Sequence, residues 1–285
     1  MHRGEIGLIT IGIDFGSSYT DVVEMHCKLV SKFFCMPSNS QSIGILAEMF
    51  ANSPEKARAK KRFAVTGNAR LQKEFLKLSR ASGLQFKKIG ELQAIASGAA
   101  FLSGKKRFVA INVGTGTPIL LVKGTKFKHL GGTGMGGGTI AGLAKLLLGE
   151  KPEDIEEIAK HGKDSLDLAV SDIVGGKIGI MPASATASNF GKARRSVHAA
   201  REDVALSILK MVAETIGVIS ALAAGKAGCK EIVFTGRPIA LNRTFQKKVV
   251  QTIALFGKKA VIPSHGEYCT AIGAALSAEK GRKHG

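Results

Sequence analysis

Two glycine-rich stretches carry the residues with the clearest chemical potential in the sequence. The first is Gly-Thr-Gly-Thr at residues 114–117, and the second is Gly-Gly-Thr-Gly-Met-Gly-Gly-Gly at residues 131–138. Glycine permits positive φ and, without a Cβ, lets backbone N–H groups come close to a ligand. The second stretch leads into residues 139–148, whose apolar spacing is helical, and a helix N-terminus favours an anion. These stretches therefore predict a binding site for the phosphates of a nucleotide.

The elements that position these stretches occur twice in the chain. Apolar strand patterns enter and leave the first glycine stretch, which predicts a strand, a tight turn and a second strand. Near the N-terminus, an alternating segment over residues 8–13 ends in Asp14-Phe-Gly, where the second copy has Asn112-Val-Gly. Each copy continues with a Ser/Thr-rich turn and two further strand patterns. The sequence therefore predicts two copies of one β-rich unit, whose glycine turns face each other across a cleft and hold a polyphosphate from both sides.

The remaining segments complete the two predicted units. Further strands are expected over residues 62–67, 84–89, 231–235 and 260–262, and helices over residues 42–52, 69–80, 91–101, 152–160, 165–174, 202–224, 242–255 and 270–280. A loop rich in Gly, Pro, Ala and Ser is expected over residues 175–191, and its length makes it a functional candidate. The helix at 202–224 is apolar over much of its surface, as in a packing layer or a subunit interface. We predict an N-terminal domain over 1–103 and a C-terminal domain over 104–285 that contains this dimerisation helix.

Composition limits the class of protein. The chain has 285 residues, 45% of them hydrophobic, which is enough to fill two cores. No apolar run is expected to reach membrane-spanning length and no signal-peptide pattern precedes the first strand, so we expect a cytoplasmic location and no membrane partner. The four cysteines have no C-x-x-C spacing and are expected to be reduced thiols rather than metal ligands.

The net charge of +19 suits an acidic ligand such as a nucleotide. Nucleic acid is not expected as a specific partner, because the basic residues are scattered, Trp is absent and no nucleic-acid motif occurs. Residues 132–137 satisfy G-x-G-x-x-G, but no strand follows the next helix as a dinucleotide-binding βαβ unit requires. No G-x-x-x-x-G-K-[ST] sequence is present, so the predicted phosphate site is not a P-loop.

The duplicated units, with an Asp-x-Gly turn in the first copy and a Gly-Thr-Gly turn in the second, resemble the actin, sugar-kinase and heat-shock ATPase superfamily. Within it, the chain resembles the type II pantothenate kinases over nearly its whole length. The resemblance rests on Asn-Val-Gly-Thr-Gly-Thr at residues 112–117, the glycine stretch at 131–138, and Ala-Ser-Asn-Phe-Gly at residues 187–191. It implies an α/β fold of duplicated ribonuclease-H-like, actin-like ATPase domains with an ATP cleft between them. It also implies a homodimeric, ATP- and Mg²⁺-dependent kinase that phosphorylates the primary hydroxyl of pantothenate or of a relative such as pantetheine.

The resemblance assigns two carboxylates to catalysis. Asp14 would lie near Mg²⁺, although an aspartate in this position can also form an Asx-turn that only shapes the loop. Glu91 matches the general base that accepts the proton of the substrate hydroxyl, although its position alone is explained by the preference for glutamate at a helix N-terminus. Phosphoryl transfer depends mainly on positioning and charge neutralisation, so these two groups with Mg²⁺ and backbone donors form a sufficient set.

The other implied contacts fall into two groups. Predicted ATP contacts come from the glycine-rich turns of both copies and are Gly16, Ser17, Ser18, Gly114, Thr115, Gly116, Thr117, Gly134, Gly136, Gly137, Gly138 and Gly236, the last of which would border the adenine. Predicted contacts with the acceptor are Lys128, His129, Asn189 and Phe190. His129 stands where family members carry an arginine, and a neutral imidazole cannot form the bidentate fork of a guanidinium group.

Two other interpretations compete with the kinase. The activator ATPases of 2-hydroxyacyl-CoA dehydratases are built on the same duplicated unit, but they need cysteines at the second glycine turn to hold an iron–sulfur cluster. Residues 131–138 contain no cysteine. A non-catalytic nucleotide-binding regulator would not need both Asp14 and Glu91, so their joint presence favours an enzyme.

Overall fold

The computed structural model describes residues 9–52, 61–195 and 199–279, which form two compact units. Unit 1 comprises Met1–Lys105 and Tyr268–Gly285, and unit 2 comprises Lys106–Glu267. The predicted domain boundary, after residue 103, lies two residues from the first structural boundary. The predicted C-terminal domain wrongly included the last helix, however, because that helix packs in unit 1. Residues 8 and 280, at the outer ends of the first predicted strand and the last predicted helix, lie outside the described residues.

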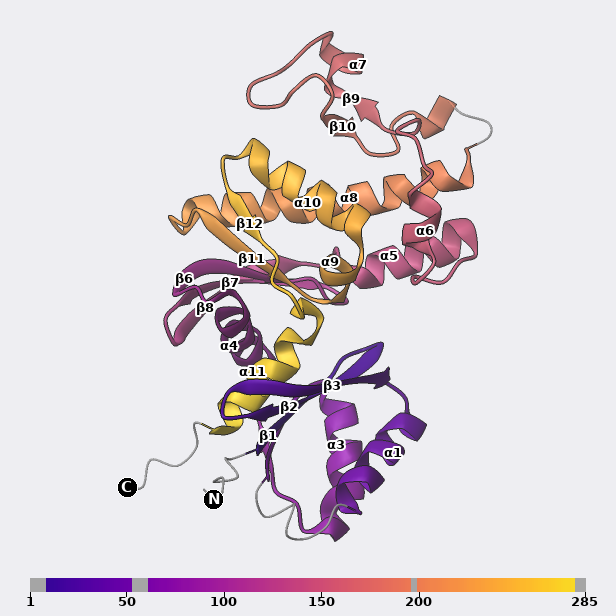
Figure 1. Cartoon of the computed structure of the whole chain (residues 1–285). Coiled ribbons are helices and arrows are strands. Elements are labelled where there is room, and N and C mark those ends of the chain that lie inside the picture. The colour runs from indigo at the N-terminus through magenta and orange to yellow at the C-terminus, as the bar shows by residue number, and fades with distance from the viewer. Residues whose placement is uncertain (1–8, 53–60, 196–198, 280–285) are drawn as a thin grey trace, which may run out of the picture. The chain divides into compact units, whose positions relative to one another are not determined.

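Unit 1 is built on a mixed five-stranded sheet (Figure 1). Its strands are β1 (Ile9–Phe15), β2 (Tyr19–His26), β3 (Leu29–Pro37), β4 (Lys61–Gly67) and β5 (Phe86–Lys88), and its helices are α1 (Ser40–Ala51), α3 (Ala69–Leu78), η1 (Ser79–Ser82), α4 (Glu91–Ser103) and α11 (Cys269–Glu279). The strand order is β3-β2-β1-β4-β5. The first three strands are antiparallel, whereas β4 is parallel to β1 and β5 is parallel to β4.

The two faces of the unit 1 sheet are packed differently. On one face, Ile11, Ile13 and Phe15 alternate along β1 and are buried with apolar residues of α1 and α3. On the other face, α4 and α11 approach each other so closely that a Cβ at Gly98 would collide with the Cys269 carbonyl group. The small residues of α4 therefore allow close contact with α11.

Unit 2 repeats the sheet of unit 1. Its strands are β6 (Arg107–Asn112), β7 (Thr117–Lys123), β8 (Lys126–Thr133), β11 (Glu231–Thr235) and β12 (Lys259–Val261), and its main helices are α5 (Gly137–Leu143), η2 (Ala144–Leu148), α6 (Ile155–Ala159), α8 (Arg201–Lys226), α9 (Arg237–Leu241) and α10 (Arg243–Leu255). The order β8-β7-β6-β11-β12 matches that of unit 1, with three antiparallel strands followed by two parallel ones. The predicted duplication is confirmed.

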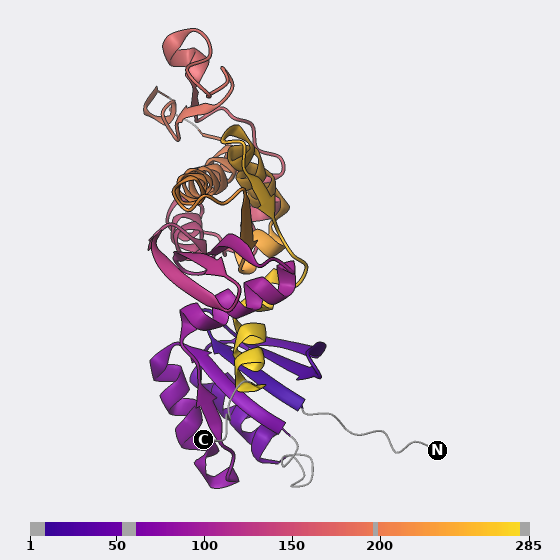
Figure 2. The same ribbon diagram turned by 90° about the vertical axis from the view of Figure 1, so that its left-hand side faces the viewer.

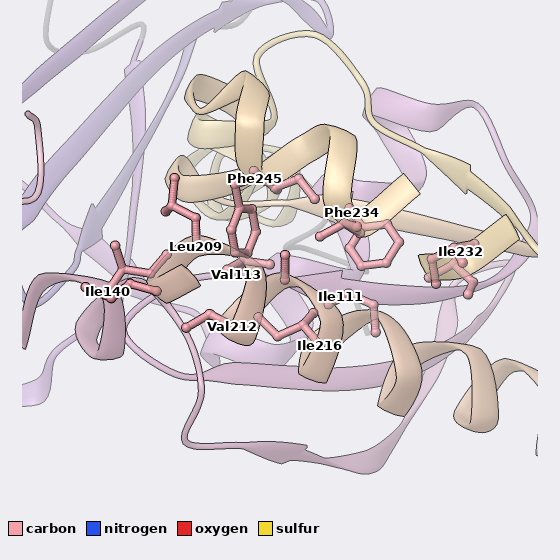
Figure 3. Packing of buried hydrophobic residues seen from close by; sticks show 14 of the residues in the cluster. Ile111, Val113, Ile140, Leu209, Val212, Ile216, Ile232, Phe234 and Phe245 are labelled. Atoms are coloured by element: carbon pink, nitrogen blue, oxygen red, sulfur yellow. The ribbon is translucent and has the colours of Figure 1, made fainter. Parts of the chain in front are cut away.

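The core of unit 2 lies between its sheet and the helices α8 and α10. Leu209, Val212 and Ile216 of α8 share one buried cluster with Ile111 of β6 and Phe234 of β11, part of which is drawn in Figure 3. The expectation that no apolar run could span a membrane was wrong for α8, which is long and apolar enough to do so. Because 67% of its apolar window is buried inside the protein, α8 behaves as a core helix.

Local signals fixed some elements better than others. Asparagine side chains accept backbone N–H bonds at the starts of α1, α3 and α10, which is the expected N-cap chemistry.

Three of the predicted segments after residue 150 were wrong in extent. The helix predicted over 152–160 is confined to α6, and the segment 165–174 contains a short strand, β9 (Leu168–Ala169), before the helix α7 (Val170–Val174). The predicted loop at 175–191 includes β10 (Thr186–Ser188), which pairs with β9.

Candidate active site

Unit 1 gathers carboxylates where β1 ends. Asp14 lies in β1 and pairs in antiparallel register with the buried Asp21 of β2. Glu91 is the exposed first residue of α4, and the buried Thr270 of α11 forms a side-chain hydrogen bond with Asp14. The two predicted catalytic residues, Asp14 and Glu91, are therefore close enough to interact.

The environment of Asp14 disfavours its negative charge. Burial raises the pKa of Asp14 to about 8, and repulsion by Asp21 and Glu91 adds to this effect, while the hydrogen bond with Thr270 opposes it. The carboxyl group of Asp14 is therefore largely protonated at neutral pH in the free protein. A pKa raised by burial and by neighbouring charges is typical of functional carboxyl groups.

This site fits a Mg²⁺ ion that also binds phosphate. Among the described residues, no three His, Cys, Asp or Glu side chains form a group that could hold a metal by themselves. Mg²⁺ commonly takes one or two carboxylates and completes its shell with water and substrate phosphates. A cation beside Asp14 would also offset the repulsion that raises the pKa of this residue.

Two members of this site, Asp21 and Thr270, were missed at the sequence level. The short turn between β1 and β2 contains the signal for Asp21, because antiparallel pairing across it brings Asp21 opposite Asp14. Thr270 gave no such signal, since it lies in a helix that returns to unit 1 from the far end of the chain.

The turn after Asp14 contains the three predicted ATP contacts of unit 1. The N–H of Gly16 donates to the Tyr19 carbonyl oxygen at 3.0 Å, so it is committed to closing the turn. Ser17 and Ser18 are exposed, and the described part of the chain offers no backbone acceptor to their N–H groups. Their N–H groups therefore remain available to a ligand. Gly67, at the end of β4, adopts φ +86° beside Asp14, where a Cβ would meet the carboxyl oxygen Oδ1.

The glycine turns of unit 2 pack directly against one another. The N–H of Gly137 donates to the Gly114 carbonyl oxygen at 2.7 Å, and the N–H of Gly138 donates to the Thr115 carbonyl oxygen at 3.1 Å. Gly236 joins them, since its φ of +97° lets the chain pass the Val113 carbonyl group, which a Cβ would strike. The predicted glycines of unit 2 thus come together where β6 and β11 end, the usual ligand-binding edge of parallel strands.

The chemistry of these glycines differs from the prediction. The N–H groups of Gly114, Gly136, Gly137 and Gly138 all have acceptors within the protein, so the helix N-terminus does not offer them to phosphate. The hydroxyl of Thr117 is buried and donates to the Met135 carbonyl oxygen at 2.8 Å. In the described structure the N–H groups of Thr115, Gly116 and Gly134 have no protein acceptor, and they remain as candidate phosphate donors. Gly131 and Gly132, predicted in the turn, belong to β8.

Replacing Gly136 by alanine should separate the two turns. A Cβ on Gly136 would lie 2.6 Å from the Thr115 carbonyl oxygen and 2.8 Å from that of Gly114, closer than real Cβ atoms approach. Relieving such a clash typically costs about 1–3 kcal/mol, so we expect ATP affinity, measured by titration calorimetry, to fall about tenfold. Gly142→Ala is the matched control, because its Cβ would meet no atom within 4 Å and Gly142 is not among the ATP contacts. Equal affinities in the two variants would contradict this account.

The four predicted acceptor contacts do not form one site within unit 2. Lys128 and His129 are exposed on β8, the edge strand of the sheet, where they pair with Leu121 and Leu120 of β7. Asn189 and Phe190 follow β10, and Figures 1 and 2 place β8 and β10 at opposite ends of unit 2. The spacing in sequence did not reveal this separation. In space α8 lies between the two segments, although it follows both of them in the sequence.

Comparisons with known proteins identify relatives of this chain over most of its length. A sequence model of the Fumble family matches residues 106–277. A type II pantothenate kinase from Bacillus cereus is 30% identical over 275 residues, which cover 94% of this chain and 96% of that protein. A type II pantothenate kinase from Bacillus anthracis is 30% identical over 277 residues, which cover 94% of this chain and 97% of that protein.

Solved structures with low sequence identity share the fold. The activator of the 2-hydroxyisocaproyl-CoA dehydratase from Clostridium difficile, with bound ADPNP, has a TM-score of 0.62 at 18% identity and covers 95% of this chain and 94% of its own. A ROK family glucokinase from Streptomyces griseus, in complex with glucose and AMPPNP, has a TM-score of 0.61 at 14% identity and covers 96% of this chain and 100% of its own. The Fumble model, which matches more than half of the chain, and the relatives at 30% identity show that the chain belongs to the Fumble family of type II pantothenate kinases.

Proposed function

We propose that the protein transfers the γ-phosphoryl group of ATP to the primary hydroxyl of pantothenate, the first step of coenzyme A biosynthesis. The observation that carries the proposal is the interaction of Asp14, Asp21 and Glu91 in unit 1 of a member of this family. Asp14, whose pKa is raised, and Glu91, which is exposed at the start of α4, are suited to two different roles.

Glu91 is the general base in this proposal. Its exposed carboxylate accepts the proton of the acceptor hydroxyl, whose oxygen forms a bond to the γ-phosphorus while the bond from that phosphorus to the β–γ bridging oxygen breaks. The products are phosphopantothenate and ADP. Asp14, in its ionised form, would hold Mg²⁺, and the cation would neutralise charge on the phosphate oxygens.

The proposed ATP contacts follow the donors that the fold leaves available. Thr115 and Gly116 offer N–H groups from the first turn of unit 2, and Gly134 offers one from the second. Ser17 and Ser18 offer N–H groups from the turn of unit 1. Gly236 borders the adenine, and its missing Cβ keeps the approach to Val113 open.

A cytoplasmic homodimer is the proposed assembly. The segment of residues 163–192, which we call the arm, exposes four large aliphatic side chains: Ile173 (61% exposed), Val174 (51%), Ile178 (56%) and Ile180 (59%). Several exposed aliphatic side chains on one short segment are typical of an interaction surface. We expect light scattering to give the mass of a dimer, and a monomer at assay concentrations would contradict this part of the proposal.

The activity is tested by ADP release in a coupled assay. Pantothenate, pantetheine, N-acetylhexosamines and a reaction without acceptor are compared at the same ATP and Mg²⁺ concentrations. We expect ADP release that depends on pantothenate and a phosphorylated product in the mass spectrum. Equal ADP release without acceptor would refute the kinase, and a response to sugars alone would refute the acceptor class.

A further inference from the structure

Helix α8 carries a polar stripe on an otherwise apolar surface. Its members, Asp203, Ser207, Lys210 and Glu214, are spaced by four, three and four residues, which places them on one face of the helix. Asp203, Ser207 and Lys210 are buried, and Glu214 is half-buried. Buried charges on a core helix are costly unless they are paired. The charged members of the stripe find their partners in the arm, which projects from unit 2 in Figures 1 and 2.

The first member, Asp203, holds the start of the arm. Its carboxylate accepts the N–H of Lys163 at 2.6 Å and the hydroxyl of Ser165. These donors hold the pKa of Asp203 below its usual value, the Ser165 hydroxyl having the larger effect. The entry to the arm is therefore fixed to α8.

Lys210 fixes the backbone at Phe190 through an intermediate carboxylate. Its Nζ lies 2.5 Å from Asp164 Oδ1 and 2.9 Å from Asp167 Oδ2. The other oxygen of the buried Asp167 accepts the N–H of Phe190 at 2.8 Å. Phe190 has a φ of +56°, a conformation that L-residues rarely adopt without support from their surroundings. Lys210 thus holds in place the group that supports this strained residue.

Glu214 fixes the side chain of the neighbouring residue. Its Oε1 accepts the hydroxyl of Thr186 and its Oε2 accepts Nδ2 of Asn189, both at 2.9 Å. One N–H of Asn189 Nδ2 is therefore committed, while its second N–H and Oδ1 remain for a ligand. Glu214 sets which way that oxygen points.

We propose that Lys210 and Glu214 are positioning residues, which hold Phe190 and Asn189 in the conformation that binds the acceptor. This inference rests on the proposed function and on the acceptor contacts that the family resemblance implies for Asn189 and Phe190. The short strands β9 and β10 supply few backbone bonds of their own, so the arm depends on α8 for its shape. The acceptor is recognised by the Asn189 oxygen and by the backbone around Phe190, and ATP is not.

Glu214→Ala and Glu214→Gln form a matched pair for the test. Alanine removes both contacts, whereas the glutamine oxygen can still accept from Asn189 while its amide donates to the Thr186 hydroxyl. We expect the alanine variant to raise the KM for pantothenate about tenfold, with kcat and the KM for ATP within twofold of wild type. Hydrogen exchange of residues 186–190 should accelerate in the alanine variant alone.

Other results would overturn the inference. An unchanged KM for pantothenate in Glu214→Ala would remove the positioning role. A parallel loss in kcat, both KM values and melting temperature would assign the stripe to stability only. If wild-type protein shows no pantothenate-dependent turnover, the proposed function fails and the acceptor-binding role fails with it. Hydrogen exchange then tests the positioning alone: unchanged exchange at 186–190 in the alanine variant would show that Glu214 does not hold Asn189 and Phe190 in place.

Discussion

Glu91→Gln should reduce pantothenate-dependent turnover by at least about a hundredfold, the usual contribution of a general base. Glutamine keeps the size of the side chain and its place at the start of α4 but cannot accept the hydroxyl proton at neutral pH. ATP should still bind, because the predicted nucleotide contacts do not include Glu91. Turnover is measured by ADP release and ATP binding by titration calorimetry.

Glu48→Gln is the control for this substitution. Glu48 is an exposed glutamate of α1 in the same unit, so the change removes the same charge away from the carboxylate cluster. A second readout separates catalysis from general charge effects. Because Glu91 raises the pKa of Asp14, Glu91→Gln should lower it, whereas Glu48→Gln should not. If Glu91→Gln retained the turnover of Glu48→Gln, Glu91 would not be the base.

Most of the fold could be predicted because local patterns agree with the tertiary structure. Alternation along β1, and the match between Asp14-Phe-Gly and Asn112-Val-Gly, gave the duplicated sheets before any contact was known. The domain division failed at α11, since sequence order says nothing about a helix that crosses back to the first unit. The secondary structure of the arm was also predicted poorly, because strands of two and three residues carry no periodic signal in the sequence.

The candidate site shows a different limit. The residue types were sufficient to predict Asp14, Glu91 and the glycine turns as site residues. The structure brings Asp14 and Glu91 together within unit 1, and it brings the two glycine turns together within unit 2. What sequence could not give was the partner of each backbone N–H. Gly137 and Gly138 were expected to donate their N–H groups to phosphate, yet these N–H groups donate to carbonyl oxygens of the first glycine turn. Their missing Cβ atoms serve the same packing, since a Cβ on Gly138 would collide with Thr115 of the first turn and a Cβ on Gly137 would crowd Pro238 and the Gly114 carbonyl oxygen.

Asp14→Asn is expected to reduce Mg²⁺-dependent turnover at least about a hundredfold, because the amide cannot supply the anionic oxygen that a hard cation prefers. The same change should stabilise the free protein near pH 8. In the unfolded chain Asp14 ionises near pH 3.8, whereas in the folded protein it retains its proton until about pH 8. As pH rises between these values, the unfolded state is increasingly favoured, so the contribution of Asp14 to stability is lost.

Asparagine carries no charge at any pH and escapes this penalty. The melting temperature of Asp14→Asn minus that of wild type should therefore be small at pH 4 and increase up to pH 8, by roughly 2–4 °C for each 1 kcal/mol. Mg²⁺ should narrow the difference at pH 8, since it stabilises only the protein that keeps the carboxylate. Asp154→Asn, at an exposed aspartate, is the control and should show no such trend. A difference that does not vary with pH would mean that Asp14 is ionised in the folded protein and that its neighbours do not oppose its charge.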